Sequence, residues 1–341
     1  MPDEKLKEKI GKMEMFLTNE VDGEEKDDMV EIGNGFHLYV GIAEKLYLYQ
    51  KEGLLWMWKL FLKKRGGVLG DDMGLGKTVQ VVSFLSGMFD AELVKSVLLI
   101  MPVSLIPNWK KEFNTWAPGI KVHDYYTGTK LEKERNLTRA QRRGGVLITS
   151  YGMLLHNYEQ LSVCNGQKFT WCYLVLDEGH KIKNPTQTTK AVYEIPAKNR
   201  LVLTGTAIQN NLRELWALFN FTHQGTLLGS LATFKTQYET PINRAREKDA
   251  TAGERRLGIE IAQALKQKIA PFFLRRTKAE VLQDTENGDP DSQSLVPKLV
   301  FTAKKNDLVV WTFLSDLQKK LYKEERSCGL DLPFRPAEET L

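Results

Sequence analysis

The chain has 341 residues, of which 42% are hydrophobic and 27% are charged, close to the composition of globular proteins. This composition excludes a wholly disordered chain, a collagen-like repeat and a small disulfide scaffold. No apolar run approaches the roughly 20 residues that a membrane span needs, so no membrane partner is expected. Although the net charge is +5, residues 1–31 carry five Lys against eleven acidic residues. A basic body behind an acidic segment indicates an anionic partner, with nucleic acid as the first candidate.

The residue pattern divides the chain into five parts, each with its own character. Residues 1–35 are an acidic lead-in without long apolar periodicity, and residues 36–211 alternate strand-like and helix-like segments. Residues 212–282 read as a helical insertion with no clear strand. A polar stretch with Gly and two Pro predicts a flexible loop over residues 283–297. Residues 298–341 are too short for a second full domain and are expected to be a connector.

The first predicted element is a helix over residues 44–64, where apolar side chains recur at helical spacing. Short runs rich in Val, Ile and Leu then alternate with helix-like segments, as strands buried on both faces of a sheet do. These runs are Gly67–Leu69, Val97–Ile100, Val122–Tyr126, Val146–Thr149, Tyr173–Leu176 and Leu201–Leu203. The alternation predicts an α/β fold with a doubly wound parallel sheet. The expected helices of the insertion are Leu212–Phe221, Leu231–Tyr238 and Arg255–Ile269.

A glycine-rich turn follows the first predicted strand and precedes a helix, which is the context of a phosphate-binding loop. Gly74 and Gly76 allow the backbone N–H groups to curl around a phosphate chain. The Lys77 ammonium would reach the β- and γ-phosphates, and the Thr78 hydroxyl would bind Mg²⁺. The usual pattern has a further glycine at position 71, which is Asp here. The alternative is a glycine-rich turn with a chance Lys-Thr. The predicted nucleotide-binding residues of this loop are Asp72, Met73, Gly74, Leu75, Gly76, Lys77 and Thr78.

Two acidic residues end a later strand-like run, Tyr173–Leu176. The carboxyl ends of such strands are where open α/β sheets bind ligands. Asp177 would hold Mg²⁺, and Glu178 would orient and deprotonate the attacking water. His180 follows closely and is expected to couple the nucleotide site to the next motif by hydrogen bonds. The alternatives are a solvated strand end for the acids and a structural role for the histidine.

Together these blocks resemble the Swi2/Snf2 branch of the superfamily 2 helicase-like ATPases. The resemblance rests on residues 72–78, on Asp177-Glu178-Gly179-His180 and on Leu203-Thr204-Gly205-Thr206. Other family blocks follow in order, at residues 48–53, 101–102, 149–151, 209–211 and 273–278. The resemblance implies a RecA-like, P-loop NTPase fold that uses ATP and Mg²⁺.

The resemblance also assigns roles to single residues. Gln50 would read the adenine edge, and Gln209 would join Lys77, Asp177, Glu178 and His180 in the catalytic set. The lobe would also contribute half of a DNA track, whose residues would touch phosphates. Its residues would be Pro102, Ser104, Lys110, Thr149, Ser150, Tyr151 and Asn210. Three basic pairs, Arg142–Arg143, Lys181 with Lys183, and Arg275–Arg276, fit either further DNA contacts or a solvated surface.

Family members hydrolyse ATP and move along double-stranded DNA without separating its strands, using two RecA-like lobes. The second lobe carries a Gln-x-x-Gly-Arg-x-x-Arg motif, which the 341 residues do not contain. The chain is therefore expected to be the first lobe, nearly inactive on its own, whose partners are double-stranded DNA and the second lobe. Ala207 replaces the usual Pro after Thr-Gly-Thr, which we expect to loosen that turn without abolishing activity.

Within the family, three stretches resemble one group of mitotic, chromosome-bound members. They are residues 86–91, 98–102 and 241–251. This likeness implies a nuclear or chromosomal location, with the centromere and kinetochore in mitosis, and a mitotic kinase among possible protein partners. A second group of the family is the nearest rival. Two other functions stay open: a DExH-type RNA helicase lobe, and a non-catalytic module that binds nucleotide or DNA.

Overall fold

The computed structural model describes residues 28–182, 184, 186–205, 212–281 and 313–320. The chain forms two units, residues 1–296 and 297–341. The second unit is described only at residues 313–320, where residues 316–320 are helical. The predicted flexible loop and most of the predicted connector thus lie outside the described residues. Among the described helices, none combines the length and apolar character that crossing a membrane requires.

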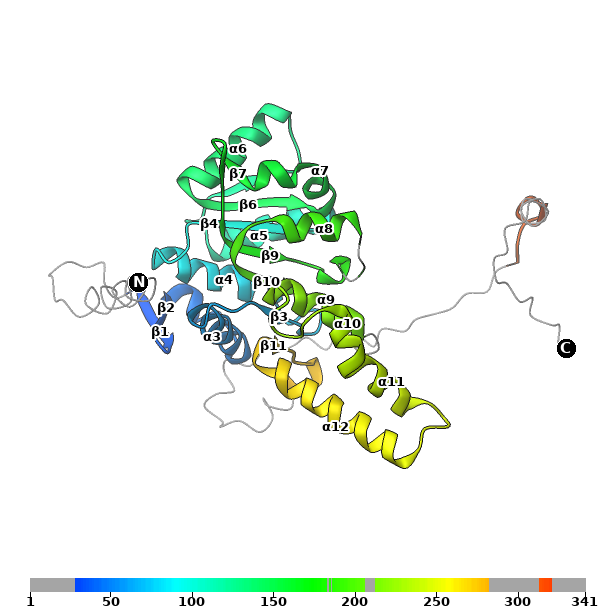
Figure 1. Ribbon diagram of the computed structural model, residues 1–341. Helices are drawn as coiled ribbons and strands as arrows, with labels where there is room; N and C mark the ends of the chain where they lie inside the picture. Colours follow the sequence, from blue (N-terminus) through cyan, green and yellow to red (C-terminus); the bar gives the residue numbers. More distant parts are fainter. Residues whose placement is uncertain (1–27, 183, 185, 206–211, 282–312, 321–341) are drawn as a thin grey trace. The chain divides into compact units, whose positions relative to one another are not determined.

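A seven-stranded, fully parallel sheet forms the centre of the first unit, with strand order β11-β3-β10-β9-β4-β6-β5 (Figure 1). The strands are β3 (Gly67–Leu69), β4 (Ser96–Met101), β5 (Val122–Asp124), β6 (Gly145–Ser150), β9 (Trp171–Leu176), β10 (Ala197–Leu203) and β11 (Phe273–Leu274). All six strands predicted from the sequence are present, and the doubly wound α/β fold is confirmed. Apart from the half-buried edge strand β5, their apolar runs are continuous because both faces of the sheet are covered.

Successive residues of each strand point into two separate cores. In β4, Leu98 and Ile100 join one core, while Leu99 and Met101 join the other. The core that contains Leu99 and Met101 is covered by α3 (Leu48–Leu62), α4 (Lys77–Asp90) and α5 (Ile106–Trp116), with the short α2 (Val40–Ala43) beside them. The core that contains Leu98 and Ile100 is covered by α6 (Lys130–Arg143), α7 (Tyr151–Leu161), α8 (Gln187–Glu194) and α9 (Leu212–His223). Helices on both faces leave the ends of the strands free for a site.

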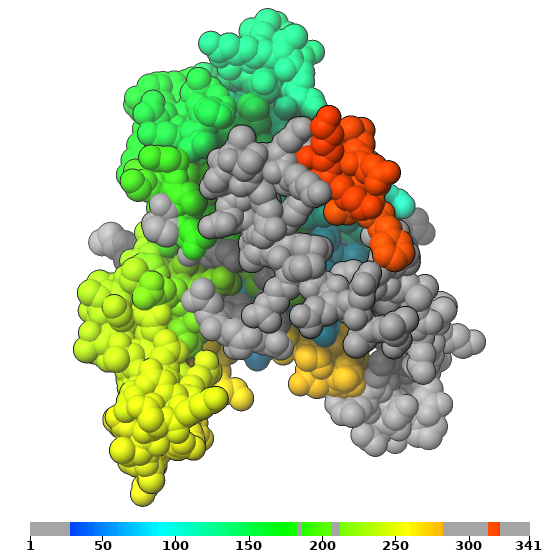
Figure 2. Space-filling view, turned by 90° about the vertical axis from the view of Figure 1, so that its right-hand side faces the viewer, coloured from blue at the N-terminus to red at the C-terminus, as the bar shows by residue number. Residues whose placement is uncertain are grey.

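A helical arm projects from the sheet unit (Figures 1 and 2). It contains α10 (Leu231–Phe234), the π-helical turn η3 (Lys235–Glu239), α11 (Thr240–Arg246) and α12 (Ala252–Ile269). A capping box starts α12: Thr251 Oγ1 accepts from the Glu254 N–H at 3.2 Å, and the Glu254 carboxylate accepts from the Thr251 N–H at 2.8 Å. The arm agrees with the expected helical character of residues 212–282.

One expectation for this region is wrong, because residues 273–274 form a strand. The strand β11 pairs in parallel with β3 at the edge of the main sheet. A two-residue strand leaves no periodic signal in the sequence, and its partner lies about 200 residues earlier. The main chain thus returns from the helical arm to the strand that carries the predicted phosphate loop.

Two short antiparallel hairpins complete the described chain. One joins β1 (Met29–Gly33) to β2 (Phe36–Tyr39), so the described part of the expected lead-in belongs to a hairpin. The other joins β7 (Val163–Cys164) to β8 (Gln167–Lys168). Single turns of 3₁₀ helix occur at η1 (Val103–Leu105), η2 (Gly179–Ile182) and η4 (Ala270–Phe272).

Candidate nucleotide-binding site

The turn between β3 and α4 has the backbone shape of a phosphate cradle. Gly74 and Gly76 have φ values of 89° and 72°, in the left-handed region that favours glycine. A Cβ at position 76 would also stand 2.6 Å from Nε2 of Gln50. Lys77 is the first residue of α4, so the free N–H groups of the helix start face the turn. The local geometry therefore suits an anion.

The ammonium group of Lys77 lies inside this turn. It donates to the carbonyl oxygens of Asp71 at 2.6 Å and Asp72 at 3.3 Å. Burial lowers the pKa of Lys77, whereas the charges of Asp71, Asp177 and Glu178 act to raise it. Asp177 and Glu178, which follow β9, thus lie near enough for their charges to act on the ammonium. This is expected if the phosphate loop and the acidic pair form one site.

Gln50 packs under the phosphate loop. Its side chain is 5% exposed, its Oε1 accepts from the Tyr47 N–H at 3.1 Å, and its Nε2 donates to the Leu75 carbonyl at 3.5 Å. The Tyr49 hydroxyl donates to the same carbonyl at 3.3 Å. The segment predicted to read adenine is thereby joined to the loop predicted to bind phosphate. Adenine recognition by Gln50 stays a prediction.

Asp177 and Glu178 follow directly after β9, as predicted. Asp177 is 8% exposed, and its carboxylate accepts from the Trp109 indole N–H at 2.7 Å and from the Glu178 N–H at 2.9 Å. Burial raises the pKa of Asp177, while these two hydrogen bonds act to lower it. Glu178 has a φ of +54°, a conformation that costs a non-glycine residue free energy and that recurs at functional sites.

His180 lies beside the second acid, with its Nδ1 3.1 Å from Oε2 of Glu178. Its predicted coupling role is compatible with this position and stays a prediction. Gln209 and Asn210, together with Ala207, lie outside the described residues. The strand that precedes them, β10, ends close to the loop, since a Cβ at Gly205 would stand 3.4 Å from Nζ of Lys77.

The donor set fits a magnesium–nucleotide better than a protein-only metal site. The described residues hold no group of three or more His, Cys, Asp or Glu side chains that could bind a metal ion. Mg²⁺ usually takes one or two protein ligands and completes its shell with phosphate oxygens and water. Thr78 in the first turn of α4 and Asp177 after β9 are the predicted protein ligands.

The described residues of the predicted DNA track lie in the segment from Pro102 to Lys110, which follows β4, and at the carboxyl end of β6 with the start of α7. Ser104 is exposed, and Lys110 pairs with Asp124 at 2.8 Å. Thr149 and Tyr151 are buried and donate to the carbonyls of Tyr125 and Asp177, both at 2.8 Å. The other two residues are Pro102, which is half-buried, and Ser150, whose Oγ accepts from the Met153 N–H at the start of α7. The structure places Ser104 and Lys110 where a ligand can reach them.

Two features of the site were missed by the sequence analysis. The indole of Trp109 bonds directly to Asp177, although Trp109 was not among the predicted site residues. The guanidinium of Arg276 is bound to Asp71, although Arg276 was expected on a DNA-facing or solvated surface. Both contacts join segments far apart in the sequence, so no local pattern could reveal them.

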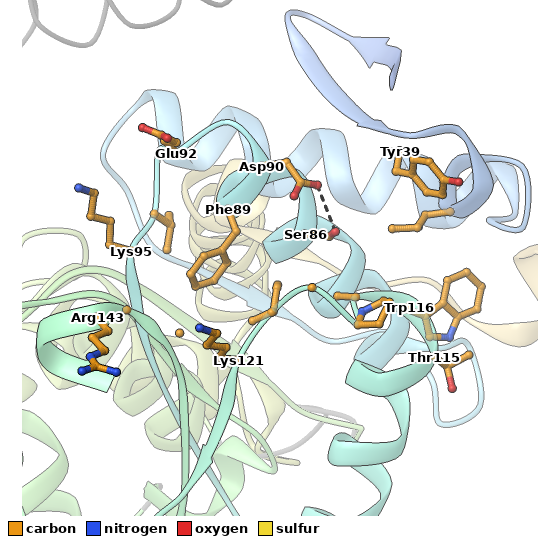
Figure 3. Close-up of a pocket in the computed structure, with 18 of the residues that line it drawn as sticks. Tyr39, Ser86, Phe89, Asp90, Glu92, Lys95, Thr115, Trp116, Lys121 and Arg143 are labelled. Carbon is orange, nitrogen blue, oxygen red and sulfur yellow. Dashed lines mark hydrogen bonds between the residues drawn. The ribbon is translucent and has the colours of Figure 1, made fainter. Parts of the chain in front are cut away.

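A cavity of about 1000 Å³ lies elsewhere, at the edge where β4, β5 and β6 begin (Figure 3). Parallel strands that begin at one edge end at the opposite one, so this cavity is remote from the phosphate loop. Its lining carries the acids Asp90 and Glu92 and five basic residues, which are Lys45, Lys95, Lys121, Arg142 and Arg143.

Comparisons with known proteins agree with this geometry. The SNF2-related domain model matches residues 49–331. The DNA excision repair protein ERCC-6-like of Danio rerio is 51% identical over 95% of this chain and 23% of its own length. The Sulfolobus solfataricus SWI2/SNF2 ATPase core in complex with dsDNA is 34% identical, with a TM-score of 0.57, over 72% of this chain and 47% of that chain.

The comparisons also separate the two groups within the family. The three stretches singled out in the sequence resemble the ERCC-6-like proteins, also known as PICH, and the rival was the Cockayne syndrome B group. Human DNA excision repair protein ERCC-6, which represents that rival, is 34% identical over 91% of this chain and 20% of its own length. The higher identity to the ERCC-6-like protein confirms the first group.

The chain spans between a fifth and a quarter of the length of these curated relatives. The family match covers most of it, including the phosphate loop, the acidic pair and strand β11. This assignment decides against the DExH-type RNA helicases as the parent family. The chain belongs to the SNF2-related domain family.

Proposed function

We propose that this chain is the ATP-binding lobe of a Snf2-type translocase, in which ATP hydrolysis drives movement along double-stranded DNA without strand separation. The observation that carries the proposal is the convergence of Lys77, Asp177 and Glu178 at one sheet edge. Their charges act on one another across the ends of β3 and β9. The cradle of N–H groups beside them suits the phosphates of a nucleotide.

The proposed roles follow from where each side chain lies. The loop 72–76 would hold the phosphates, and the Lys77 ammonium would leave its two carbonyl partners to bind the β- and γ-phosphates. Thr78 and Asp177 would hold Mg²⁺, which supplies charge neutralisation on the phosphate oxygens. Glu178 would orient the attacking water and take its proton, and His180 would couple the nucleotide site to the next motif. Gln50 would bind adenine, and Gln209 would complete the catalytic set.

A DNA track along the ends of β4 and β6 is the second part of the proposal. Ser104 and Lys110 would contact phosphates first, because both can be reached by a ligand. Pro102, Ser150 and Asn210 would complete the track, whereas the buried Thr149 and Tyr151 would reach a phosphate only after their hydroxyls leave the Tyr125 and Asp177 carbonyls. Contacts to the backbone carry no sequence information, so binding should tolerate any sequence and weaken with salt.

The location and the partners of the protein are the third part of the proposal. We propose a nuclear, chromosomal location, with the centromere and kinetochore in mitosis as its finer form. A mitotic kinase is the proposed protein partner, and a second RecA-like lobe is the proposed catalytic partner. In domain terms, we propose residues 36–211 as the first RecA-like lobe, 212–282 as its helical arm, 283–297 as a loop and 298–341 as a connector.

The decisive experiment measures ATP hydrolysis by the full-length protein with duplex DNA, with RNA and without nucleic acid. Duplex DNA should stimulate turnover, and Glu178→Gln should lower it by about 10²–10⁴-fold, the usual cost of losing a general base. Preference for RNA would overturn the choice of substrate. If Lys77→Ala leaves ATP affinity unchanged, the loop does not bind nucleotide and the chain is a module of another kind.

The 341-residue chain by itself should show almost no DNA-stimulated turnover. The sequence contains no Gln-x-x-Gly-Arg-x-x-Arg block, and arginine fingers of that kind contribute about 10³–10⁵ in kcat. Rapid, DNA-dependent hydrolysis by the purified chain would contradict this division of labour between two lobes.

A further inference from the structure

Asp71 is a buried charge to which the proposed mechanism gives no role. It stands in the phosphate loop, where the common pattern has a glycine, and its side chain is 0% exposed. An isolated carboxylate in such a place would be very costly, so a buried acid needs both a counter-ion and hydrogen bonds. Asp71 has both, and they come from a segment about 200 residues later.

The counter-ion is Arg276, which follows β11. Its Nε donates to Oδ1 of Asp71 at 3.1 Å, and its Nη2 donates to Oδ2 at 2.5 Å. The Arg276 backbone N–H adds a third bond to Oδ1 at 3.0 Å. Two parallel bonds from one guanidinium to one carboxylate fix direction as well as distance, which a lysine ammonium does not do.

The same guanidinium also contacts the helices α3 and α4. Its Nη2 donates to Oε1 of Gln80 at 2.9 Å, and its Nη1 donates to the carbonyl of Tyr49. Gln80 in turn donates to Oδ2 of Asp71 at 3.1 Å and to the Leu75 carbonyl at 3.3 Å. Arg276 therefore joins the segment that carries Gln50, the phosphate loop and helix α4 in one network.

A glycine in α3 makes room for this network. A Cβ at Gly53 would stand 2.0 Å from Oε1 of Gln80 and 3.2 Å from Nη2 of Arg276. The main chain reinforces the arrangement, because Gly70 N–H donates to the Leu274 carbonyl at 2.7 Å and Asp72 N–H donates to the Arg276 carbonyl at 3.0 Å. The backbone on either side of Asp71 is thus hydrogen-bonded to the segment around β11.

We propose that Arg276 is a positioning residue for the nucleotide pocket. With Asp71 as its buried counter-ion, it holds the phosphate loop in register with the Tyr49–Gln50 segment before nucleotide arrives. The pocket consequently depends on the segment 273–276, which returns from the helical arm. This inference rests on the proposed nucleotide binding but can fail separately from it.

The test uses the 341-residue chain with wild-type sequence, Arg276→Lys and Arg276→Gln. Two measurements are made: affinity for a fluorescent ATP analogue with Mg²⁺, and hydrogen exchange of the loop amides 72–77 without nucleotide. Arg276→Lys keeps the charge but loses the fork, so nucleotide affinity should fall about tenfold and the loop amides should exchange faster. Nucleotide affinity and hydrogen exchange are measured below the melting temperature of each variant, after circular dichroism shows that the variant is folded.

Arg256→Lys is the matched control. Arg256 lies in α12 and pairs with Glu260 at 3.0 Å on an exposed surface, so its replacement should leave both readouts unchanged. Asp71→Asn should repeat the Arg276→Gln effect, and the double variant should bind nucleotide no more than about twofold worse than Arg276→Gln, since both remove one interaction.

Each outcome decides the question. Faster loop exchange together with weaker nucleotide binding in folded Arg276→Lys supports the positioning role. Wild-type exchange in that variant overturns the role, even if the variant melts earlier. If Arg276→Gln does not fold, Arg276→Lys still decides. If the wild-type chain binds no nucleotide, the proposed function fails for the chain alone, and the exchange measurement still tests the position of the loop.

Discussion

The indole N–H of Trp109 donates a hydrogen bond to Oδ2 of Asp177 over 2.7 Å. Trp109 belongs to α5, the helix that follows the predicted DNA-binding residues Pro102 and Ser104, whereas Asp177 is the predicted Mg²⁺ ligand. Both side chains are buried, at 1% and 8% exposure. A hydrogen bond to a charged group is worth about 1.5–3 kcal/mol, which is enough to fix one rotamer of the acid. The contact thus ties the helix beside the predicted DNA track to the predicted metal ligand.

Replacing Trp109 by Phe should weaken nucleotide binding only when Mg²⁺ is present. The ring still fills its core position, but Oδ2 of Asp177 loses its donor, and the pKa of Asp177 rises further because one of the hydrogen bonds that oppose the effect of burial is lost. We expect about a tenfold loss of affinity for the magnesium–nucleotide, measured by titration with a fluorescent ATP analogue. The same titration in EDTA, which removes Mg²⁺, should show almost no loss of nucleotide affinity relative to the wild type.

The matched control for this change is Trp171→Phe. The Trp171 indole is equally buried and donates to the Leu161 carbonyl at 2.9 Å, at the far end of β9. It should lose stability without losing magnesium dependence. Equal losses of nucleotide affinity in both variants would show that packing, and not the bond to Asp177, is what matters.

Much of the fold was visible in the sequence, for a physical reason. Five of the six predicted strands are buried on both faces, so their Val, Ile and Leu runs are continuous, whereas the edge strand β5 is half-buried. The phosphate loop and Asp177-Glu178 sit at strand ends where local spacing predicts them. Strand β11, the Trp109–Asp177 bond and the Arg276–Asp71 pair could not be predicted. Each depends on which distant segments meet, which single-residue patterns do not encode.

Gly76 offers a direct test of the cradle. Gly76→Ala places a side chain on a residue with a φ of 72° and 2.6 Å from Nε2 of Gln50. The loop must shift, so its N–H groups no longer converge and ATP affinity should fall by at least about tenfold. Calorimetric titration with ATP and Mg²⁺ measures this. Gly152→Ala, in α7 with open space around it, should bind ATP as the wild type does; a normal Gly76→Ala affinity would contradict the cradle.

His223 should make stability depend on pH. Burial and the charge of Arg65 lower its pKa from 6.5 to about 4, so the folded protein holds the neutral ring between Thr222 and Phe272. A lowered histidine pKa gives stability that is complete above pH 6.5 and is lost as the pH falls towards 4. The loss should reach up to about 3 kcal/mol.

Urea unfolding at pH 7.5 and at pH 5.0 measures this effect. Because other groups titrate in the same window, the quantity compared is the difference between wild type and His223→Gln at each pH. The variant should be less stable than wild type at pH 7.5, and the gap should narrow at pH 5.0. A gap that is constant with pH would mean that His223 keeps its ordinary pKa in the folded protein.

Lys110 should contribute one phosphate contact to duplex DNA, and Asp124 should restrain it. Their ion pair of 2.8 Å lies beside the predicted DNA track, and the bond to Asp124 raises the pKa of Lys110, so the ammonium is charged. Lys110→Ala should reduce the slope of log affinity against log salt by about 0.9, the amount expected for one phosphate contact. Asp124→Asn leaves Lys110 without its counter-ion, so DNA binding at low salt should tighten.

Fluorescence anisotropy with a labelled duplex at several KCl concentrations measures both effects. Lys130→Ala, on an exposed ion pair at the start of α6, is the control for general charge loss. An unchanged slope in Lys110→Ala would place the track elsewhere.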